Sequence, residues 1–278
     1  MRIGVIGTGV MGKAISSYLS LFDCVDVIQW VGSADQKALC EMDSLKKVAR
    51  RIARKIGSSR RDYVDKLIPI NNINNLRDID ILIEAVKENI DIKKDIFRKV
   101  DNAVSENCII ATNTSSISIT GLASVISNPR RVLGLHFFNP IEFTDLVEVI
   151  SGFYTSDETI SSVKDFIGKI EKKAVYINET PGFIVNRMLI PMINEAITLL
   201  AEGAAKREAI DDAMKYGANH PIGPLSLADL IGNDVVLSIM QTLFEETNDP
   251  KYRPHYLLKK MVRSGSLGRK TKIGFYEY

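Results

Sequence analysis

The chain has 278 residues, of which 45% are hydrophobic and 25% charged, and its 36 basic and 34 acidic residues give a net charge of +2. This length is enough for two domains, and the near-neutral balance gives no whole-chain attraction to nucleic acid or to an anionic membrane. No apolar stretch is long enough to span a bilayer. Met1 leads directly into an apolar strand, without a signal peptide, so a cytoplasmic protein is expected.

The first twelve residues combine a strand with a glycine-rich loop. Gly7-Thr-Gly-Val-Met-Gly12 follows an apolar run and opens a helical pattern that extends to residue 21. In such a loop the first glycine permits a tight turn, the second lets backbone approach a pyrophosphate, and the third allows the helix to pack on the strand. The helix N-terminus then attracts the phosphates. We therefore predict a dinucleotide site at Gly7, Thr8, Gly9, Val10, Met11 and Gly12.

The second strand, residues 25–31, ends without the acid that usually binds the ribose hydroxyls of NAD. Trp30 stands at that place. An indole can stack on adenine but cannot accept two ribose hydrogen bonds, and without a carboxylate nothing there repels a 2′-phosphate. The sequence therefore predicts that Trp30 contacts the cofactor and leaves both NAD and NADP open.

Up to about residue 180, short β-rich runs alternate with helical stretches, which predicts a largely parallel sheet covered by helices. The later β-runs are 79–86, 108–112, 132–138, 146–150 and 174–177, and the helical stretches between them are 89–104, 117–126 and 156–170. From residue 181 onward only helical segments follow, at 182–203, 206–217, 225–231, 234–246 and 255–264. We expect an α/β Rossmann-type domain over 1–181 and an all-α domain over 182–278.

Three cysteines, Cys24, Cys40 and Cys108, are far apart, and no two of them form a CxxC pair. An odd number without such a pair predicts reduced, small core residues rather than disulfides or metal ligands. No metal site is predicted.

His136 and Glu148 lie in two neighbouring apolar segments, 131–140 and 144–150. A histidine held by a carboxylate from an adjacent strand is well suited to accept a proton during catalysis. A buried histidine satisfied by a structural carboxylate has the same appearance in sequence, so the residues alone leave both interpretations open.

A basic amphipathic helix is predicted from Ser44 onward, because Leu45, Val48, Ile52 and Ile56 recur at spacings of three and four. Its basic residues are Lys46, Lys47, Arg50, Arg51, Arg54, Lys55, Arg60 and Arg61. The basic face could be solvated, bind nucleic acid or a membrane surface, or bind the phosphates of a ligand. The near-neutral chain and the lack of interleaved aromatic residues argue against nucleic acid.

Taken together, the motifs resemble the short-chain (S)-3-hydroxyacyl-CoA dehydrogenase family over the whole chain, and most closely its monofunctional 3-hydroxybutyryl-CoA dehydrogenases. Besides the glycine loop, they are Asn113-Thr-Ser-Ser116, His136-Phe-Phe-Asn-Pro140, Leu146-Val-Glu-Val149, Thr180-Pro-Gly-Phe-Ile-Val-Asn-Arg187, Gly223-Pro224 and a Gly268–Tyr276 tail. The resemblance implies a helical C-terminal domain that forms a homodimer. It also implies interconversion of (S)-3-hydroxybutyryl-CoA and acetoacetyl-CoA with a nicotinamide cofactor, NAD being the family's usual choice.

The resemblance also implies roles for individual residues. His136 would be the catalytic acid and base, Glu148 would orient it, and Ser115 and Asn186 would contact the 3-oxygen of the substrate. Ser44 and Arg51 would contact CoA. Cofactor contacts are implied at Glu88, Asn89, Lys93, Asn113, Ser115 and Asn139. Without the resemblance, Ser115 could equally be a turn cap and Asn186 an ordinary polar residue in the first turn of a helix.

Two rival functions share parts of the pattern. A 3-hydroxyacid dehydrogenase of the 6-phosphogluconate or hydroxyisobutyrate type shares the glycine loop, but it needs a catalytic lysine where this chain has Asn186. A non-catalytic nucleotide-binding protein predicts an incomplete catalytic set, whereas the set here is complete. From the length we expect no additional hydratase domain.

Overall fold

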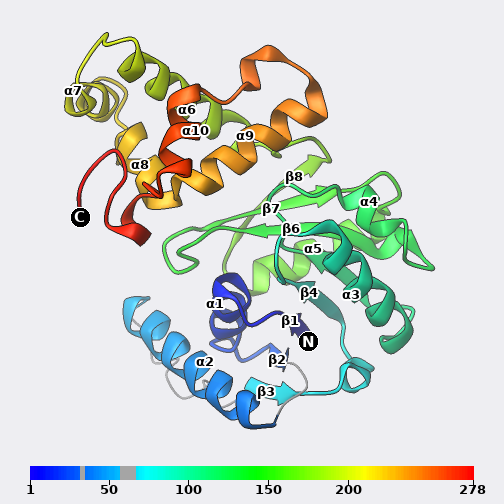
Figure 1. Ribbon diagram of the computed structural model, residues 1–278. Helices are drawn as coiled ribbons and strands as arrows, with labels where there is room; N and C mark the ends of the chain where they lie inside the picture. Colours follow the sequence, from blue (N-terminus) through cyan, green and yellow to red (C-terminus); the bar gives the residue numbers. More distant parts are fainter. Residues whose placement is uncertain (32–34, 57–66) are drawn as a thin grey trace. The chain divides into compact units, whose positions relative to one another are not determined.

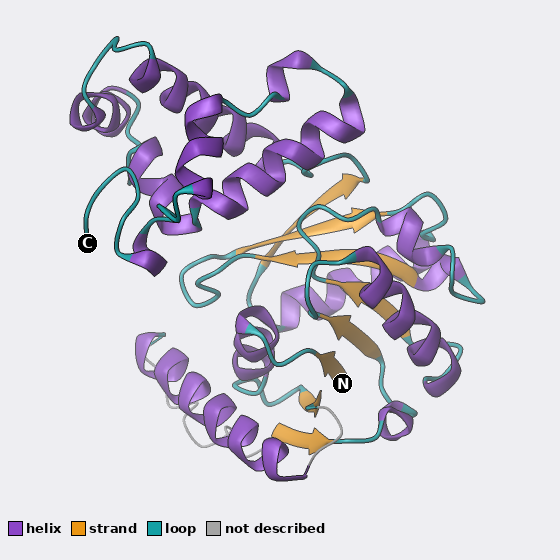
Figure 2. Cartoon of the chain, viewed as in Figure 1, coloured by secondary structure: helices purple, strands orange, loops and turns teal. Residues whose placement is uncertain are grey.

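The computed structural model describes residues 1–31, 35–56 and 67–278, with the backbone alone for 35–42 (Figure 1). The chain divides into two compact units, Met1–Glu179 and Thr180–Tyr278. Strands and helices make up the first unit and helices make up the second (Figure 2). The predicted fold class, an α/β domain followed by a helical one, is confirmed.

An eight-stranded sheet in the order β3-β2-β1-β4-β5-β6-β7-β8 forms the centre of the first unit. All neighbouring strands are parallel except β6 and β7, which are antiparallel. The strands are β1 Arg2–Ile6, β2 Asp26–Trp30, β3 Leu67–Ile70, β4 Ile81–Glu84, β5 Ile109–Thr112, β6 Val132–Phe137, β7 Leu146–Ser151 and β8 Lys173–Asn178. The chain order reverses between β1 and β4, and such a reversal creates the crevice in which open α/β sheets bind ligands.

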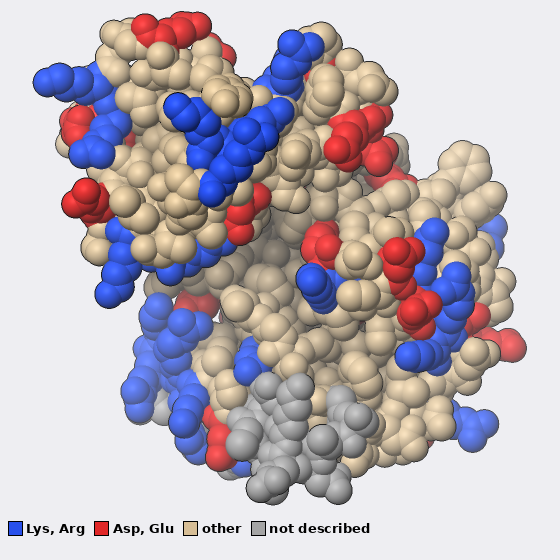
Figure 3. Space-filling model, viewed as in Figure 1, with Lys and Arg blue, Asp and Glu red and all other residues tan. Residues whose placement is uncertain are grey.

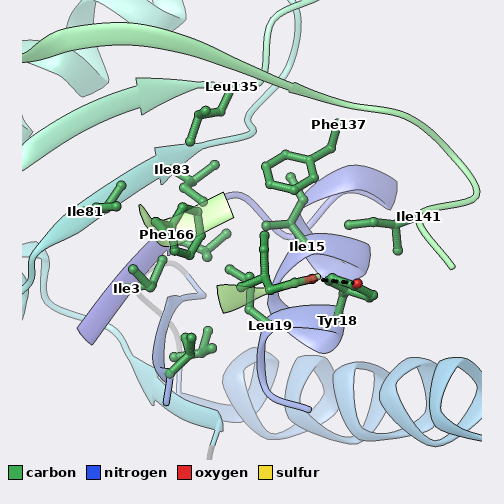
Figure 4. Close-up of a cluster of buried hydrophobic side chains, with 14 of the residues drawn as sticks. Ile3, Ile15, Tyr18, Leu19, Ile81, Ile83, Leu135, Phe137, Ile141 and Phe166 are labelled. Carbon is green, nitrogen blue, oxygen red and sulfur yellow. Dashed lines mark hydrogen bonds between the residues drawn. The ribbon is translucent and has the colours of Figure 1, made fainter. Parts of the chain in front are cut away.

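The helices of the first unit are α1 Val10–Leu19, α2 Asp35–Lys55, α3 Ile90–Ala103, α4 Ile119–Ala123 and α5 Asp157–Lys169. They cover the sheet, so β4, β5 and β6 are buried along their whole lengths. Figure 4 shows part of the resulting core, in which Ile15 and Leu19 of α1 lie close to Phe166 of α5. Tyr18 also belongs to this core and donates its hydroxyl to the carbonyl oxygen of Ile170 at 2.9 Å.

Strand β3 was not predicted from the sequence. Its run Leu-Ile-Pro-Ile contains Pro69, which lacks the N–H needed for a central strand. β3 lies at the edge of the sheet and pairs with β2 alone, where a proline is tolerated. Pro69 therefore weakens the strand pattern in the sequence, although the segment forms an edge strand.

The second unit packs its helices around its own apolar core. The helices are α6 Val185–Ala201, α7 Arg207–Asp212, α8 Pro224–Ile231, α9 Asn233–Thr247 and α10 Tyr256–Arg263. The predicted helix 206–217 is α7 followed by a π-helical turn, Ala213–Gly217. The buried carboxylate of Asp229 accepts the backbone N–H groups of Phe275 and Tyr276, both at 2.9 Å, and so ties the C-terminal tail to α8.

The cysteine prediction holds only in part. Cys24 and Cys108 are free thiols, but Cys24 is exposed, so its expected place in the core is wrong. It lies in the turn before β2, where the neighbouring Val25 takes the buried position. Cys108 is buried, which raises its pKa to about 12. Cys40 lies outside the residues whose side chains are described.

Across the described ranges, no single helix is long and apolar enough to cross a membrane. The pair α8 and α9 passes that test only together, and it bends by 97° at its break.

Candidate active site

The glycine loop borders a cavity of about 600 Å³ at the reversal between β1 and β4. Gly7 has a φ of +122°, a conformation that favours glycine, and a Cβ on Gly12 would lie 2.0 Å from the Gly7 carbonyl oxygen. At Gly9 the space that a Cβ would take is open for 4 Å around. Gly9 caps α1 without a side-chain hydrogen bond, which leaves the N–H groups of the first turn for a ligand. This geometry fits a dinucleotide pyrophosphate.

Trp30, the residue predicted to contact the adenosine end of a cofactor, lies in the same cavity. The cavity is lined by Gly7, Thr8, Gly9, Val10, Met11, Trp30, Val31, Ala85, Val86 and Lys87. None of these lining residues is acidic, and Lys87 adds a positive charge. The lining residues that the structure describes thus include no carboxylate that would repel a 2′-phosphate.

A buried glutamine that sequence reasoning missed supports the glycine loop. The Gln29 amide donates to the carbonyl oxygens of Val5 at 3.2 Å and Gly7 at 3.0 Å, and it accepts a hydrogen bond from the Ser16 hydroxyl. Gln29 has no exposed surface. The signal in the sequence was a polar residue inside the apolar run Val27–Val31.

His136 and Glu148 face each other across the antiparallel ladder of β6 and β7, where they are directly paired in register. Glu148 Oε2 lies 2.7 Å from His136 Nδ1, and the two side chains are 1% and 6% exposed. A carboxylate only accepts hydrogen bonds, so the Nδ1 proton points to Glu148 and Nε2 carries the lone pair. Nε2 lies 3.1 Å from the Ser115 hydroxyl. The arrangement can accept a proton at Nε2 and hold the resulting imidazolium against a buried carboxylate.

Glu88 organises the loop that carries Ser115. Its Oε1 accepts the backbone N–H groups of Ser115 at 3.0 Å and Ser116 at 3.2 Å, and the Thr114 hydroxyl at 2.5 Å. The carboxyl ends of the parallel strands β4 and β5 lie at the same edge of the sheet, which brings Glu88 to this loop. Asn113, at the start of the same loop, accepts the Phe137 N–H at 2.8 Å.

Lys93 is buried in an ion-pair network beneath this loop. Its ammonium lies 2.8 and 2.9 Å from the two oxygens of Glu84 and 3.4 Å from Glu88 Oε2, and its side chain is 1% exposed. Glu84, which has no exposed surface, also accepts the Thr112 hydroxyl at 2.7 Å and the Val86 N–H at 2.6 Å. Lys93 does not line the cavity at the glycine loop, so it connects the loop residue Glu88 to the core.

The predicted CoA contacts lie on α2, over which basic side chains gather on the surface (Figure 3). Ser44 is half-buried and accepts a hydrogen bond from Lys13 at 3.0 Å. Arg51 is exposed and contacts Glu142. Two of the predicted basic residues, Arg60 and Arg61, lie outside the described ranges.

The three remaining asparagines lie in separate places. Asn89 caps α3, accepting the N–H groups of Asp91 and Ile92 at 3.0 Å each. Asn139 is exposed and lies two residues after the end of β6, next to Pro140. Asn186 is half-buried in the first turn of α6, in the second unit, and its contact with a substrate stays a prediction.

Comparison with known proteins now decides the family. The model of the 3-hydroxyacyl-CoA dehydrogenase NAD binding domain matches residues 2–180, and the model of that family's C-terminal domain matches residues 182–278. The chain belongs to the 3-hydroxyacyl-CoA dehydrogenase family. The family resemblance predicted from the motifs is therefore confirmed, and with it an oxidoreductase that uses a nicotinamide cofactor.

Individual members of this family match the chain from end to end. The 3-hydroxybutyryl-CoA dehydrogenase of Clostridioides difficile is 47% identical over 280 residues, which cover 100% of this chain and 99% of that protein. The 3-hydroxybutyryl-CoA dehydrogenase of Bradyrhizobium diazoefficiens is 43% identical over 100% of this chain and 95% of its own length. The crystal structure of (S)-3-hydroxybutyryl-CoA dehydrogenase from Ralstonia eutropha has a TM-score of 0.93 at 42% identity, covering 100% of this chain and 98% of that one.

Proposed function

We propose that this protein interconverts (S)-3-hydroxybutyryl-CoA and acetoacetyl-CoA with NAD or NADP. The observation that carries the proposal is the buried His136–Glu148 pair, whose Nε2 is directed to Ser115 at the edge of the sheet. The names of the full-length relatives support the four-carbon thioester as substrate.

When bound, a nicotinamide cofactor would supply the acceptor for the hydride that leaves carbon 3 of the alcohol. His136 removes the proton of the 3-hydroxyl at Nε2, while Glu148 keeps the Nδ1 proton in place and stabilises the imidazolium. General-base catalysis of this kind contributes about 10²–10⁴-fold to the rate. In the direction of reduction, the same imidazolium protonates the developing alkoxide.

Ser115 and Asn186 would donate hydrogen bonds to the 3-oxygen as its charge changes. Ser115 is well placed for this, because Glu88 fixes its backbone and its hydroxyl already lies 3.1 Å from the base. Its single proton is donated to Nε2 while Nε2 is unprotonated, and it can be donated to the 3-oxygen once Nε2 carries a proton.

The residues of the glycine loop would hold the pyrophosphate, Trp30 would lie against the adenosine, and the loops after β4, β5 and β6 would hold the nicotinamide end. The proposed nicotinamide contacts are Glu88, Asn89, Asn113, Ser115 and Asn139, with Lys93 acting through Glu88. The proposed function is tested by assaying acetoacetyl-CoA reduction with NADH and NADPH in parallel, and absence of turnover with both would overturn it.

Replacing Trp30 with aspartate is expected to raise the ratio of kcat/KM for NADH over NADPH by at least about tenfold. A carboxylate at this place would accept hydrogen bonds from the ribose hydroxyls of NADH and repel the 2′-phosphate of NADPH. The same parallel assay measures the ratio, with Trp30→Phe as the uncharged control. An unchanged ratio in Trp30→Asp would show that the adenosine ribose binds elsewhere.

We also propose that the helical unit forms a homodimer. Large apolar side chains on it are exposed, including Met188 at 72%, Leu230 at 50% and Tyr256 at 63%. Apolar surface of this kind is typical of interfaces between subunits. Sedimentation at micromolar concentration is expected to give the mass of two 30.9 kDa chains, and a monomer would contradict the proposal.

A further inference from the structure

The loop between β6 and β7 joins the strand of His136 to the strand of Glu148, and a buried lysine anchors it. Lys172 Nζ donates to the carbonyl oxygens of Ile141 at 2.7 Å and Thr144 at 2.6 Å. The lysine is 9% exposed and its ammonium lies 4.3 Å from the Tyr18 ring centroid, and burial lowers its pKa. Figure 4 shows Ile141 packed near Tyr18 in the core. Lys172 thus holds the loop through backbone carbonyls, while the carboxylates of Asp145 and Glu142 also attract its charge.

From this anchored loop, Glu142 extends to the basic face of α2. Its Oε1 lies 3.6 Å from Arg51 Nη2 and 3.4 Å from Lys55 Nζ. Lys55 Nζ also lies 4.4 Å from the ring centroid of Phe143, the next residue of the loop. Two cations one helical turn apart are therefore held by one carboxylate.

The burial of these three groups is unequal. The Glu142 side chain is 1% exposed, whereas Arg51 and Lys55 are 55% and 40% exposed. Glu142 Oε2 is buried and makes no hydrogen bond to any residue that the structure describes. The carboxylate therefore lies on the protein side of the two cations, and their other sides face solvent, where a ligand can approach.

We propose that Glu142 is a built-in counter-ion that limits the affinity of Arg51 and Lys55 for the phosphate groups of the CoA substrate. The inference rests on the proposed function, because it takes the CoA thioester as the ligand of α2. Glu142 would then be a specificity-determining residue, since its carboxylate repels only a substrate that carries these phosphates.

The sign of the effect follows from the arrangement of charges. A phosphate bound in front of Arg51 and Lys55 is attracted by both cations and repelled by the carboxylate behind them. Both interactions act at short range between groups that are partly shielded from water. Glu142→Gln removes the repulsion and keeps the size of the side chain. Lys172 still anchors the loop in this variant, because it binds backbone carbonyls.

The experiment compares two substrates, acetoacetyl-CoA and the acetoacetyl thioester of pantetheine, which lacks phosphates. The measured quantity is the KM of the pantetheine thioester divided by the KM of acetoacetyl-CoA. In Glu142→Gln this ratio is expected to rise about three- to tenfold at low ionic strength and to return toward the wild-type value in about 0.5 M salt. Glu142→Asp, which retains the charge, is expected to stay near the wild-type ratio.

A control substitution removes an equal charge far from α2. Glu158 is exposed and lies 3.9 Å from Arg130, so Glu158→Gln reports any general effect of net charge on the ratio. An unchanged ratio in Glu142→Gln would overturn the inference, as would equal ratios in Glu142→Gln and Glu142→Asp. If wild-type protein turned over neither thioester, the proposed function would fail first.

Discussion

Replacing His136 with glutamine is expected to lower kcat for acetoacetyl-CoA reduction about 10²–10⁴-fold, the contribution of a positioned acid and base. Glutamine can still reach Glu148 with its amide, so the buried carboxylate keeps a hydrogen bond and the fold is retained. An amide does not exchange a proton with the 3-oxygen, so the loss is expected in kcat, with little change in the KM of the cofactor.

The measurement is the steady-state rate of NADH or NADPH oxidation, followed at saturating acetoacetyl-CoA. The chain has only three histidines, which offers a matched control. His255 caps α10 by accepting the Leu257 N–H at 3.1 Å and lies in the other compact unit. His255→Gln is expected to retain most of the wild-type kcat. Full activity in His136→Gln would show that His136 is not the catalytic acid and base.

The His136–Glu148 contact could be predicted from the sequence because both partners lie on neighbouring strands joined by a short loop. Residues that face each other across an antiparallel pair are brought close together, whatever the rest of the fold does. The glycine loop could be predicted for a similar reason: its strand, turn and helix are consecutive in the chain. In both cases local geometry was enough.

The features that the sequence did not reveal depend on partners from distant segments. Gln29 meets the Gly7 carbonyl because β2 lies beside β1, and Lys172 meets Ile141 because β8 lies beside β7. In the sequence, Glu142 is one of two acids in the loop after β6, and the burial of its side chain against α2 depends on packing that no periodicity reports. Side chains whose surroundings are set by sheet order must be located in the structure.

The surroundings of Lys93 also could not be predicted from the sequence, although the residue itself was named there as a cofactor contact. The family resemblance implied a cofactor contact at Lys93, which stays a prediction, whereas the enclosure of its ammonium by Glu84 and Glu88 was found only in the structure. Replacing Lys93 with methionine is expected to lower the free energy of unfolding by about 3–5 kcal/mol, because the variant leaves the Glu84 carboxylate buried without its cation. Methionine fills much of the same volume, so a cavity adds little to this loss.

Urea denaturation followed by the fluorescence of Trp30, the single tryptophan, reports this loss in the first unit. Lys99→Met is the control, because Lys99 lies on the exposed side of the same helix and its substitution is expected to change the free energy by less than about 0.5 kcal/mol. The double variant Glu84→Gln/Lys93→Met is expected to recover most of the stability, since a neutral amide can still accept from Thr112 and Val86. If Lys93→Met were as stable as Lys99→Met, the buried ion pair would contribute nothing to the stability of the first unit.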